Sequence, residues 1–436
     1  MTRFFGALSA LILSAMPVWA IVDIQEVKSP GGITAWLVED DAIPFVALEI
    51  RFQGGAALDP EGQRGAGYFM TGLLNEGAGE FDARAYATRS EELAASFDFE
   101  IFDDSMSVSA RFLTENRDEA VEHLRIALQE PRFDADAIER LRGQIVSLIA
   151  SDEKDPDKIA ATTFDALAFP GHPYATAREG TAETVGAMTR EDIVAAHQNT
   201  FARDRIFVGA AGDITPQELG ALLDTLLGGL PESGAPLPSD ATYALEGGVT
   251  VVPYATPQSV ARFGHEGLSR DDDDFFAAFV LNQIVGGGGF NNRLMEEVRV
   301  KRGLTYGIGS YLLALDSAAL YLGQFSSDNS RIAEAIEVIR TQWADVAENG
   351  VTAEELEAAK VYLTGAYPLR FDGNGRIASI MVGMQMDDLG LDYIPTRNDK
   401  VRAVTVEDLK RVANRLLRPE DLHFVVVGQP EGLETN

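Results

Sequence analysis

The chain reads TREDIVAAHQNTFARDRIFVGAAGD at residues 189–213 and TVEDLKRVANRLLRPEDLHFVVVGQ at residues 405–429, and the two stretches align without a gap. Each opens with a threonine and an acidic first turn, the pattern of a capped helix. Each then runs into a β-branched strand that ends near a glycine. A second pair, EAVEHLR at 119–125 and EAIEVIR at 334–340, repeats in the same order and at nearly the same separation. We therefore infer a duplicated domain rather than a chance similarity between helices.

The hydrophobic pattern predicts the same alternation of strands and helices in each half. In the first half, it predicts strands at 33–38, 46–53 and 105–112 and helices at 66–74, 83–96, 117–129 and 135–150. In the second half, it predicts strands at 249–252, 304–315 and 318–326 and helices at 274–285, at 291–301 and from 331 and 352 onward. This order predicts an α+β fold of two duplicated domains, each a mainly antiparallel sheet with helices packed on one face.

A segment rich in glycine and proline separates the two halves. Residues 228–248 read GGLPESGAPLPSDATYALEGG and show little apolar periodicity, which is the composition of an exposed linker. We therefore predict an N-terminal domain at 21–228, a linker at 229–248 and a C-terminal domain at 249–436.

Residues 1–20 have the pattern of a secretory signal peptide. Arg3 supplies the positive charge, residues 4–16 are apolar apart from small residues, and Val18-Trp19-Ala20 offers a small-residue cleavage pattern. The alternative is an uncleaved anchor, but this run is shorter than the roughly 20 residues that span a bilayer. We expect the signal peptide to be removed and the mature protein, in a bacterium, to be periplasmic.

The composition excludes several classes of protein. There are 36 lysines and arginines against 68 aspartates and glutamates, a formal net charge of −32. Such a negative field opposes binding to nucleic acid or to an anionic membrane surface. The chain has no cysteine, so disulfides, thiolate metal sites and cysteine nucleophiles are excluded.

The histidines do not form a local metal site. None of the five has another at the i, i+4 spacing of a helical metal pair; they are His123, His172, His197, His265 and His423. His265-Glu266 begins like a His-Glu-x-x-His motif, but the fifth position is Ser269. We predict surface or packing roles for His123, His197 and His423.

Two further clusters have both a functional and a structural interpretation. The run Asp271–Asp274 offers carboxylates to calcium, but it precedes an apolar helix, where negative charge complements the helix dipole, and we favour that role. The run Gly286–Gly289 lacks the lysine and hydroxyl residue of a phosphate-binding loop. We predict a flexible or close-approach turn there, which leaves substrate contact open. No nucleophile motif occurs, so the residues alone reveal no catalytic centre.

The second half contains a more specific stretch, FNNRLMEEVRVKRGLTYGIGSYL at 290–312, preceded by NQIVGGGG. It resembles the C-terminal domain signature of the pitrilysin/insulinase-type (inverzincin) zinc peptidases. RGAGYFMTGLLNEGAG at 64–79 and FPGHPYATAREGT at 169–181 are similar to other stretches of that family. The resemblance covers nearly all of the mature chain.

The resemblance implies that this chain lacks the family's zinc site. Active members carry His-x-x-Glu-His in the first helix, and the matching positions here are Tyr68, Thr71 and Gly72. The distal glutamate ligand of the family would fall at Ser147 or Leu148. Without imidazole or carboxylate donors at these positions, zinc cannot be held and its water cannot be activated. We therefore expect no metal or other cofactor in this chain.

The resemblance also assigns a role to Arg299 and Tyr306, which match an arginine and tyrosine pair of the family. Arg299 is predicted to end a helix, Gly303 to break it and Tyr306 to begin the next strand, so that both side chains turn toward one cavity. Guanidinium and phenol groups are donors suited to a peptide carbonyl and to the oxyanion formed in its hydrolysis.

Bacterial members of the family include pairs in which one subunit carries zinc and the other supplies this arginine and tyrosine. The resemblance therefore predicts the zinc-free subunit of a periplasmic heterodimeric metallopeptidase, inactive alone, that binds unfolded peptide substrates. Its partner would be a homologous subunit that carries the zinc motif and the zinc.

Two other functions stay open at this point. The first is a structural or peptide-binding member with no catalytic role, although retention of both Arg299 and Tyr306 argues against it. The second is a metal peptidase with unrelated ligands, for which His172, in Gly171-His172-Pro173-Tyr174, is the only starting point.

Overall fold

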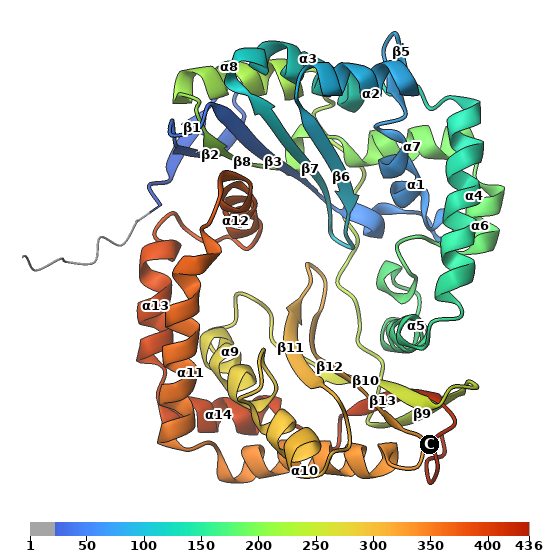
Figure 1. Ribbon diagram of the computed structural model, residues 1–436, viewed down its shortest axis with the longest axis vertical. Helices are drawn as coiled ribbons and strands as arrows, with labels where there is room; N and C mark the ends of the chain where they lie inside the picture. The colour runs from blue at the N-terminus through green and yellow to red at the C-terminus, as the bar shows by residue number, and fades with distance from the viewer. Residues whose placement is uncertain (1–21, 436) are drawn as a thin grey trace, which may run out of the picture.

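The computed structural model describes residues 22–435, which form two halves whose sheets face each other (Figure 1). The predicted signal peptide at 1–20 lies outside the described residues. Within residues 22–435, no helix is long and apolar enough to cross a membrane.

The first half is built on a six-stranded sheet in the order β1-β2-β8-β3-β7-β6. All neighbouring strands are antiparallel except β2 and β8, which are parallel. The strands are β1 (Gln25–Lys28), β2 (Thr34–Glu39), β3 (Phe45–Gln53), β6 (Ser96–Ile101), β7 (Ser105–Leu113) and β8 (Ile206–Gly212). A separate two-stranded ribbon contains β4 (Gly77–Ala78) and β5 (Phe81–Asp82).

The second half repeats this topology in a five-stranded sheet, β11-β12-β10-β13-β9. Again one pair, β9 and β13, is parallel and the others are antiparallel. The strands are β9 (Gly248–Pro253), β10 (Gln258–Glu266), β11 (Ile308–Ala314), β12 (Ala319–Asp328) and β13 (His423–Gly428). The prediction of two duplicated, mainly antiparallel domains is confirmed.

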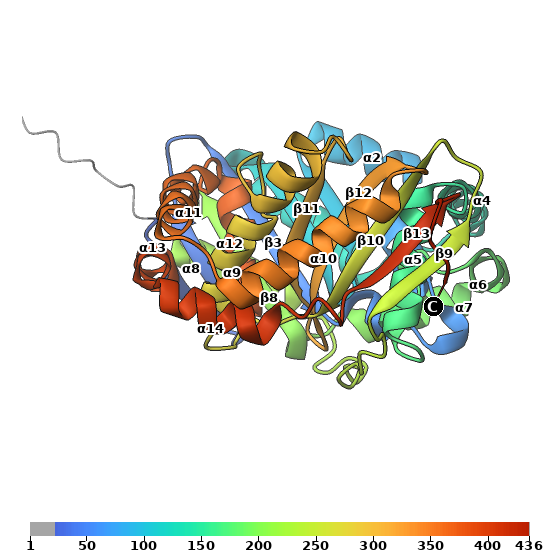
Figure 2. The same ribbon diagram turned by 90° about the horizontal axis from the view of Figure 1, so that it is seen from below.

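Helices of each half lie over the outer face of its own sheet or along the sides of the molecule (Figures 1 and 2). In the first half they are α1 (Ala66–Leu73), α2 (Ala83–Glu92), α3 (Arg117–Gln129), α4 (Ala135–Asp152), α6 (Ala182–Ala187), α7 (Arg190–Thr200) and α8 (Pro216–Leu227). In the second half they are α9 (Phe275–Val285), α10 (Ile332–Asn349), α11 (Ala353–Ala366), α13 (Tyr393–Ala403) and α14 (Val406–Leu416). Each group buries a separate apolar core against its sheet.

The inner face of each sheet is covered by a helix from the other half. Helix α5 (Pro156–Ala168) belongs to the first half but packs on β10 and β13 of the second. Helix α12 (Asn374–Met386) belongs to the second half but packs on β3 and β8 of the first. Figure 1 shows each of these helices on the side of the sheet that faces the other half. The two halves are therefore interlocked, which the sequence patterns did not indicate.

A polar contact joins the halves beside α5. Tyr174 donates its hydroxyl hydrogen to Asp104 of the first half, and the same oxygen accepts the backbone N–H of Ser317 in the second half at 3.2 Å. Asp104 also accepts the backbone N–H of Asp316 at 3.0 Å. Burial raises the pKa of Asp104 to about 6. These bonds hold the turn between β6 and β7 against the turn between β11 and β12.

The duplicated stretches adopt the predicted structure. Thr189 and Thr405 cap α7 and α14, and each forms a capping box with the aspartate three residues later. The strands that follow, β8 and β13, occupy equivalent positions in the two sheets. The segment between α8 and β9 contains no helix or strand, and β9 begins at Gly248, the last residue of the predicted linker.

Three predicted element boundaries are wrong. The helix predicted at 83–96 ends at Glu92, because Ala94 has a φ of 48° and β6 begins at Ser96. The helix predicted at 291–301 is a π-helix, η6 (Met295–Val300), in which the Lys301 N–H donates to the carbonyl oxygen of Glu296 at 2.9 Å. The Asn292 side chain accepts the N–H of Met295 at the start of this segment.

The third error concerns the strand predicted at 304–315, which begins only at Ile308 as β11. The Thr305 hydroxyl donates to the carbonyl oxygen of Gly307 and accepts its N–H. This closes a turn around Tyr306, so Tyr306 lies before the strand and does not begin it.

Candidate functional site

The positions of the family zinc motif lie on α1, and their side chains have other roles. The Thr71 hydroxyl is buried and donates to the carbonyl oxygen of Gly67 at 2.8 Å. Tyr68 is half-buried, and its burial raises the pKa of its phenol. Gly72 faces α4, where a Cβ would lie 2.8 Å from a methyl group of Leu141. A histidine at this position would therefore require Leu141 to move.

The positions expected for the distal ligand lie on α4 and offer no ligand either. The Ser147 hydroxyl donates to the carbonyl oxygen of Gly143 at 2.7 Å, and Leu148 is apolar and exposed. Within residues 22–435, no group of three or more histidines, aspartates or glutamates is arranged to hold a metal ion. The donors present on α1 and α4 do not fit zinc.

A buried carboxylate, Asp59, holds the start of α1. Its two oxygens accept the backbone N–H groups of Gly65 and Gly67, both at 2.9 Å. Burial raises the pKa of Asp59 to about 7, although these two hydrogen bonds act in the opposite direction. Asp59 thus supports the helix rather than a metal.

Each histidine is held by hydrogen bonds within the chain. The ring nitrogens of His123, His197 and His423 contact Tyr86, Leu128 and Glu246 carbonyl oxygens respectively. His172, the candidate for an unrelated metal site, contacts the carbonyl oxygen of Ser239 and accepts the N–H of Tyr174. These contacts agree with packing roles, and they leave His172 without a neighbouring ligand set.

The aspartate run before α9 forms ion pairs rather than a cation site. Asp272 and Asp274 both pair with Arg415 of α14, and Asp274 also pairs with Arg411. Asp272 accepts the backbone N–H of Asp274 at 2.8 Å. The run therefore joins α9 to α14, which adds a partner to the dipole role that was predicted.

Arg299 lies in the last turn of η6, and its side chain is not neutralised. Among residues 22–435 it has neither a hydrogen bond nor an ion pair from its guanidinium. Instead, the guanidinium carbon lies 4.7 Å from the ring centroid of Phe290. Gly303 follows with a φ of 59° and ends the helical segment as predicted.

Tyr306 projects into solvent from the turn that precedes β11. Its side chain is 82% exposed. No hydrogen bond between the Arg299 and Tyr306 side chains is present in the described part of the chain. The two donors therefore lie in one short segment, with Arg299 half-buried at the end of η6 and Tyr306 exposed on the connection to β11.

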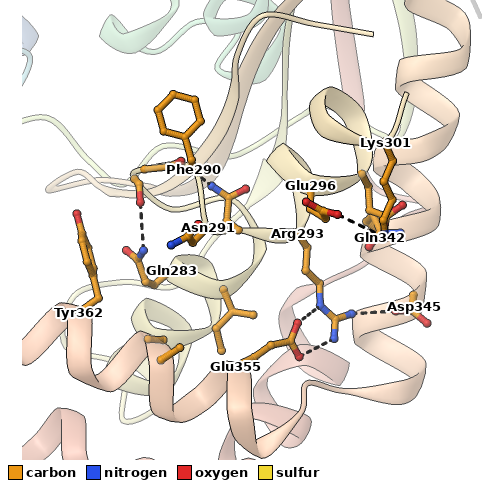
Figure 3. Close-up of a pocket in the computed structure, with 17 residues that line it drawn as sticks. Gln283, Phe290, Asn291, Arg293, Glu296, Lys301, Gln342, Asp345, Glu355 and Tyr362 are labelled. Carbon is orange, nitrogen blue, oxygen red and sulfur yellow. Dashed lines mark hydrogen bonds and ion pairs between the residues drawn. The ribbon is translucent and has the colours of Figure 1, made fainter. Parts of the chain in front are cut away.

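The other cations near Arg299 differ from it because they are paired. Glu297 binds Lys301 at 2.7 Å and Arg302 at 2.6 Å. Arg293 binds Glu355 through two nitrogens and also binds Asp345 (Figure 3). Arg299 is therefore the cation of this segment whose N–H donors are available to a ligand.

A hollow of about 700 Å³ adjoins this segment (Figure 3). It lies between the Gly286–Gly289 turn, η6 and α11, and its lining includes Gln283, Phe290, Arg293 and Tyr362. Sequence reasoning did not assign a role to Phe290 or Asn292. Their position just after Gly286–Gly289 is the sequence feature that could have indicated a role for these two residues.

Two family comparisons cover most of the chain. Residues 35–182 match the family described as "Insulinase (Peptidase family M16)", and residues 187–363 match the "Peptidase M16 inactive domain". The chain belongs to the M16 peptidase family. The boundary between the two matches precedes α7, so the inactive-domain match includes β8, α8 and the linker.

The M16 relatives include proteins with and without peptidase names. The "Non-peptidase homolog YmxG" of Helicobacter pylori is 25% identical over 391 residues, 89% of this chain and 90% of the relative. An uncharacterized zinc protease of Mycobacterium leprae is 26% identical over 394 residues, covering 89% of this chain and 88% of the relative. The mitochondrial-processing peptidase subunit beta of Blastocladiella emersonii is 22% identical over 418 residues, covering 94% and 89%.

A solved structure shares the whole fold. The crystal structure of a peptidase M16 inactive domain from Pseudomonas fluorescens has a TM-score of 0.88 and 25% identity, covering 95% of this chain and 99% of that chain. The comparisons thus place the chain among M16 homologues whose names include both zinc proteases and a non-peptidase homologue.

Proposed function

We propose that this chain is the zinc-free subunit of a heterodimeric metallopeptidase. It binds unfolded peptide and presents Arg299 and Tyr306 to the zinc site of a homologous partner subunit. The chain itself does not cleave peptides, because α1 and α4 provide no donor set for zinc.

One observation carries the proposal: Arg299 and Tyr306 are accessible donors in a segment where the other cations are paired. An arginine that only supports the fold is usually tied to a carboxylate or to carbonyl groups, as Arg293 is. A guanidinium and a phenol with free donors suit a peptide carbonyl in the ground state and the oxyanion in the transition state. This chain retains Arg299 and Tyr306 although it lacks the zinc ligands, which favours a role for these two residues in the active site of a partner subunit.

The proposed setting is the bacterial periplasm. The support is the sequence of residues 1–20, with its charged start, apolar run and small-residue cleavage pattern. The lack of cysteine is compatible with an oxidising compartment. The net charge of −32 disfavours nucleic acid as a ligand.

The test uses the full mature chain, purified alone and together with a homologous subunit that carries His-x-x-Glu-His. Zinc content and cleavage of fluorescein-labelled casein are measured for each preparation. We expect stoichiometric zinc only in the partner and cleavage only by the mixture. Arg299→Ala is expected to lower kcat/KM of the mixture by a factor of about 10²–10³, the usual cost of losing an oxyanion donor, and Tyr306→Phe to lower it in the same direction.

The matched control is Lys301→Ala, which removes a neighbouring cation that is already paired with Glu297, and which should leave turnover unchanged. Stoichiometric zinc and casein cleavage by the lone chain would overturn the proposal. Unchanged turnover with Arg299→Ala and Tyr306→Phe, in a complex that still forms, would instead favour a structural or peptide-binding member of the M16 family.

A further inference from the structure

Arg299 is positioned in an unusual way for an arginine beside acidic residues. Glu296 and Glu297 precede it on η6, but both carboxylates form ion pairs with other residues, namely Lys301 and Arg302. What remains beside Arg299 is the ring of Phe290, 4.7 Å from the guanidinium carbon. A cation over an aromatic face is held by the ring quadrupole.

This contact orients the guanidinium without consuming its donors. The N–H groups of a guanidinium lie in its plane, and an ion pair to a carboxylate would engage two of them. The ring contact leaves all of them free and leaves the charge uncompensated. The contact with the ring therefore orients the Arg299 guanidinium while all of its N–H groups stay available to donate to a ligand.

Phe290 is exposed, yet the backbone that carries it is held in place. Its side chain is 68% exposed, so burial in the core does not explain a phenylalanine here. The buried Asn292 side chain donates to the carbonyl oxygens of Gly287 and Gly289, at 2.8 and 3.2 Å. The same side chain accepts the N–H of Met295 and so caps η6.

One buried side chain thus links the two parts of the contact. Asn292 fixes the glycine turn that presents Phe290 and the start of the helix that presents Arg299. A further bond from Gln283 to the carbonyl oxygen of Gly288, at 3.2 Å, holds the turn from α9 (Figure 3). Gly289 adopts a φ of 94°, a conformation that side chains rarely tolerate.

We infer that Phe290 is a positioning residue for Arg299, holding its guanidinium over the ring so that its N–H donors face a bound peptide. This inference rests on the proposed function for its catalytic consequence, but the positioning itself belongs to the isolated chain. It gives the exposed aromatic after the four glycines a role that the family comparison does not assign.

The first experiment measures the position of Arg299 in the chain alone. In a sample labelled with ¹⁵N-arginine, the Nε–Hε signal of Arg299 is assigned by its loss in Arg299→Lys. We expect an upfield ring-current shift and restricted motion in the natural chain, both lost in Phe290→Leu and both retained in Phe290→Trp. The Arg302 signal serves as an internal control, because Glu297 holds that side chain.

Leu369→Ala is the matched control variant, since it removes another exposed apolar side chain of the second half. It should leave the Arg299 signal unchanged. An identical Arg299 shift and mobility in the natural chain and in Phe290→Leu would overturn the inference, whatever the fate of the proposed function.

The second experiment measures casein cleavage by the complex with the zinc-bearing subunit. We expect Phe290→Leu to lower kcat/KM about two- to fivefold, the factor typical of an exposed cation–π contact, and Phe290→Trp to restore it. In the Arg299→Ala background, Phe290→Leu should have no further effect, because the ring acts through the guanidinium.

These outcomes separate the two proposals. If Arg299→Ala itself leaves turnover unchanged, the proposed function fails while the spectroscopic result still decides the positioning role. If Arg299→Ala lowers turnover and Phe290→Leu does not, the proposed function stands and the positioning role of Phe290 is overturned.

Discussion

At the scale of single residues, several side chains that could take part in catalysis or metal binding are instead buried and hydrogen-bonded within the fold. His265 of β10 is an example, because it is fully buried and hydrogen-bonded to Trp343 of α10. Its Nε2 accepts the indole N–H of Trp343 at 3.1 Å, and its Nδ1 contacts the carbonyl oxygen of Glu266 at 2.7 Å. Both nitrogens are therefore used in a neutral imidazole, and burial lowers the pKa of His265 from 6.5 to about 4.

This pKa predicts a loss of stability in mild acid. Since the pKa is lower in the folded protein than in the unfolded chain, the unfolded chain binds the proton first as the pH falls. The free energy of unfolding therefore decreases between pH 6.5 and 4, by up to about 3 kcal/mol from this residue. In urea unfolding at a series of pH values, His265→Gln should show a smaller decrease over that range than the natural chain.

His172→Gln is the control for this measurement, because His172 is only half-buried in a surface turn. It should alter the pH dependence less than His265→Gln does. Parallel pH curves for the natural chain and His265→Gln would contradict the assigned protonation.

At the scale of elements, close approach between α12 and β8 is the feature on which the inner packing depends. A Cβ at Gly209 of β8 would overlap the backbone carbonyl oxygen of Ala378 in α12. Gln385 of α12 also donates to the carbonyl oxygen of Val208 at 2.8 Å. The glycine inside the first copy of the duplicated strand thus makes room for a helix from the other half.

Gly209→Ala should therefore displace α12 and lower the free energy of unfolding by about 1–3 kcal/mol, as for overpacking elsewhere. The measurement is chemical denaturation followed by circular dichroism. Gly143→Ala is the matched control, because no atom lies within 4 Å of a Cβ at this position of α4. There an alanine should stabilise the chain by roughly 0.5–1 kcal/mol through helix propensity. Equal effects of the two substitutions would contradict the packing argument.

At the scale of the whole molecule, the exchange of α5 and α12 makes the two halves depend on each other. Phe164 of α5 is fully buried among residues of the second sheet, including Leu322 and Val425. Met381 of α12 is fully buried against Trp36 of the first sheet. Neither half can bury both faces of its sheet without the other.

We therefore expect one cooperative unfolding transition for the 22–435 region. Phe164→Ala should lower its free energy of unfolding by about 3–5 kcal/mol and shift the whole transition, because α5 supports both halves. Calorimetry and circular dichroism at two wavelengths measure this shift and test for a single transition. Leu167→Ala, at a site on the same helix that is 39% exposed, should have a much smaller effect. A second transition that Phe164→Ala leaves in place would show that the halves unfold independently.

The sequence by itself determined what depends on short-range pattern and residue chemistry. The duplication, the fold class and the threonine caps follow from periodicity and capping, which act over a few residues. The resemblance to the family places the zinc motif at Tyr68, Thr71 and Gly72, and the side-chain chemistry of these residues shows that zinc donors are missing there. The late start of β11 departs from the hydrophobic pattern because the Thr305 side chain closes a local turn. The same pattern does not distinguish the π-helix η6 from an α-helix.

Only the tertiary structure decided which groups are free and which are paired. The sequence does not distinguish three arginines of this segment that have different partners in the structure. Arg293 pairs with Glu355 of α11, and Arg302 pairs with Glu297 of η6. Arg299 instead lies against the ring of Phe290, which follows the glycine turn. The exchange of α5 and α12 likewise joins residues far apart in the sequence, as Gln385 and Val208, 177 positions apart, show. Such contacts depend on how the two sheets face each other, and no pattern along the chain encodes that arrangement.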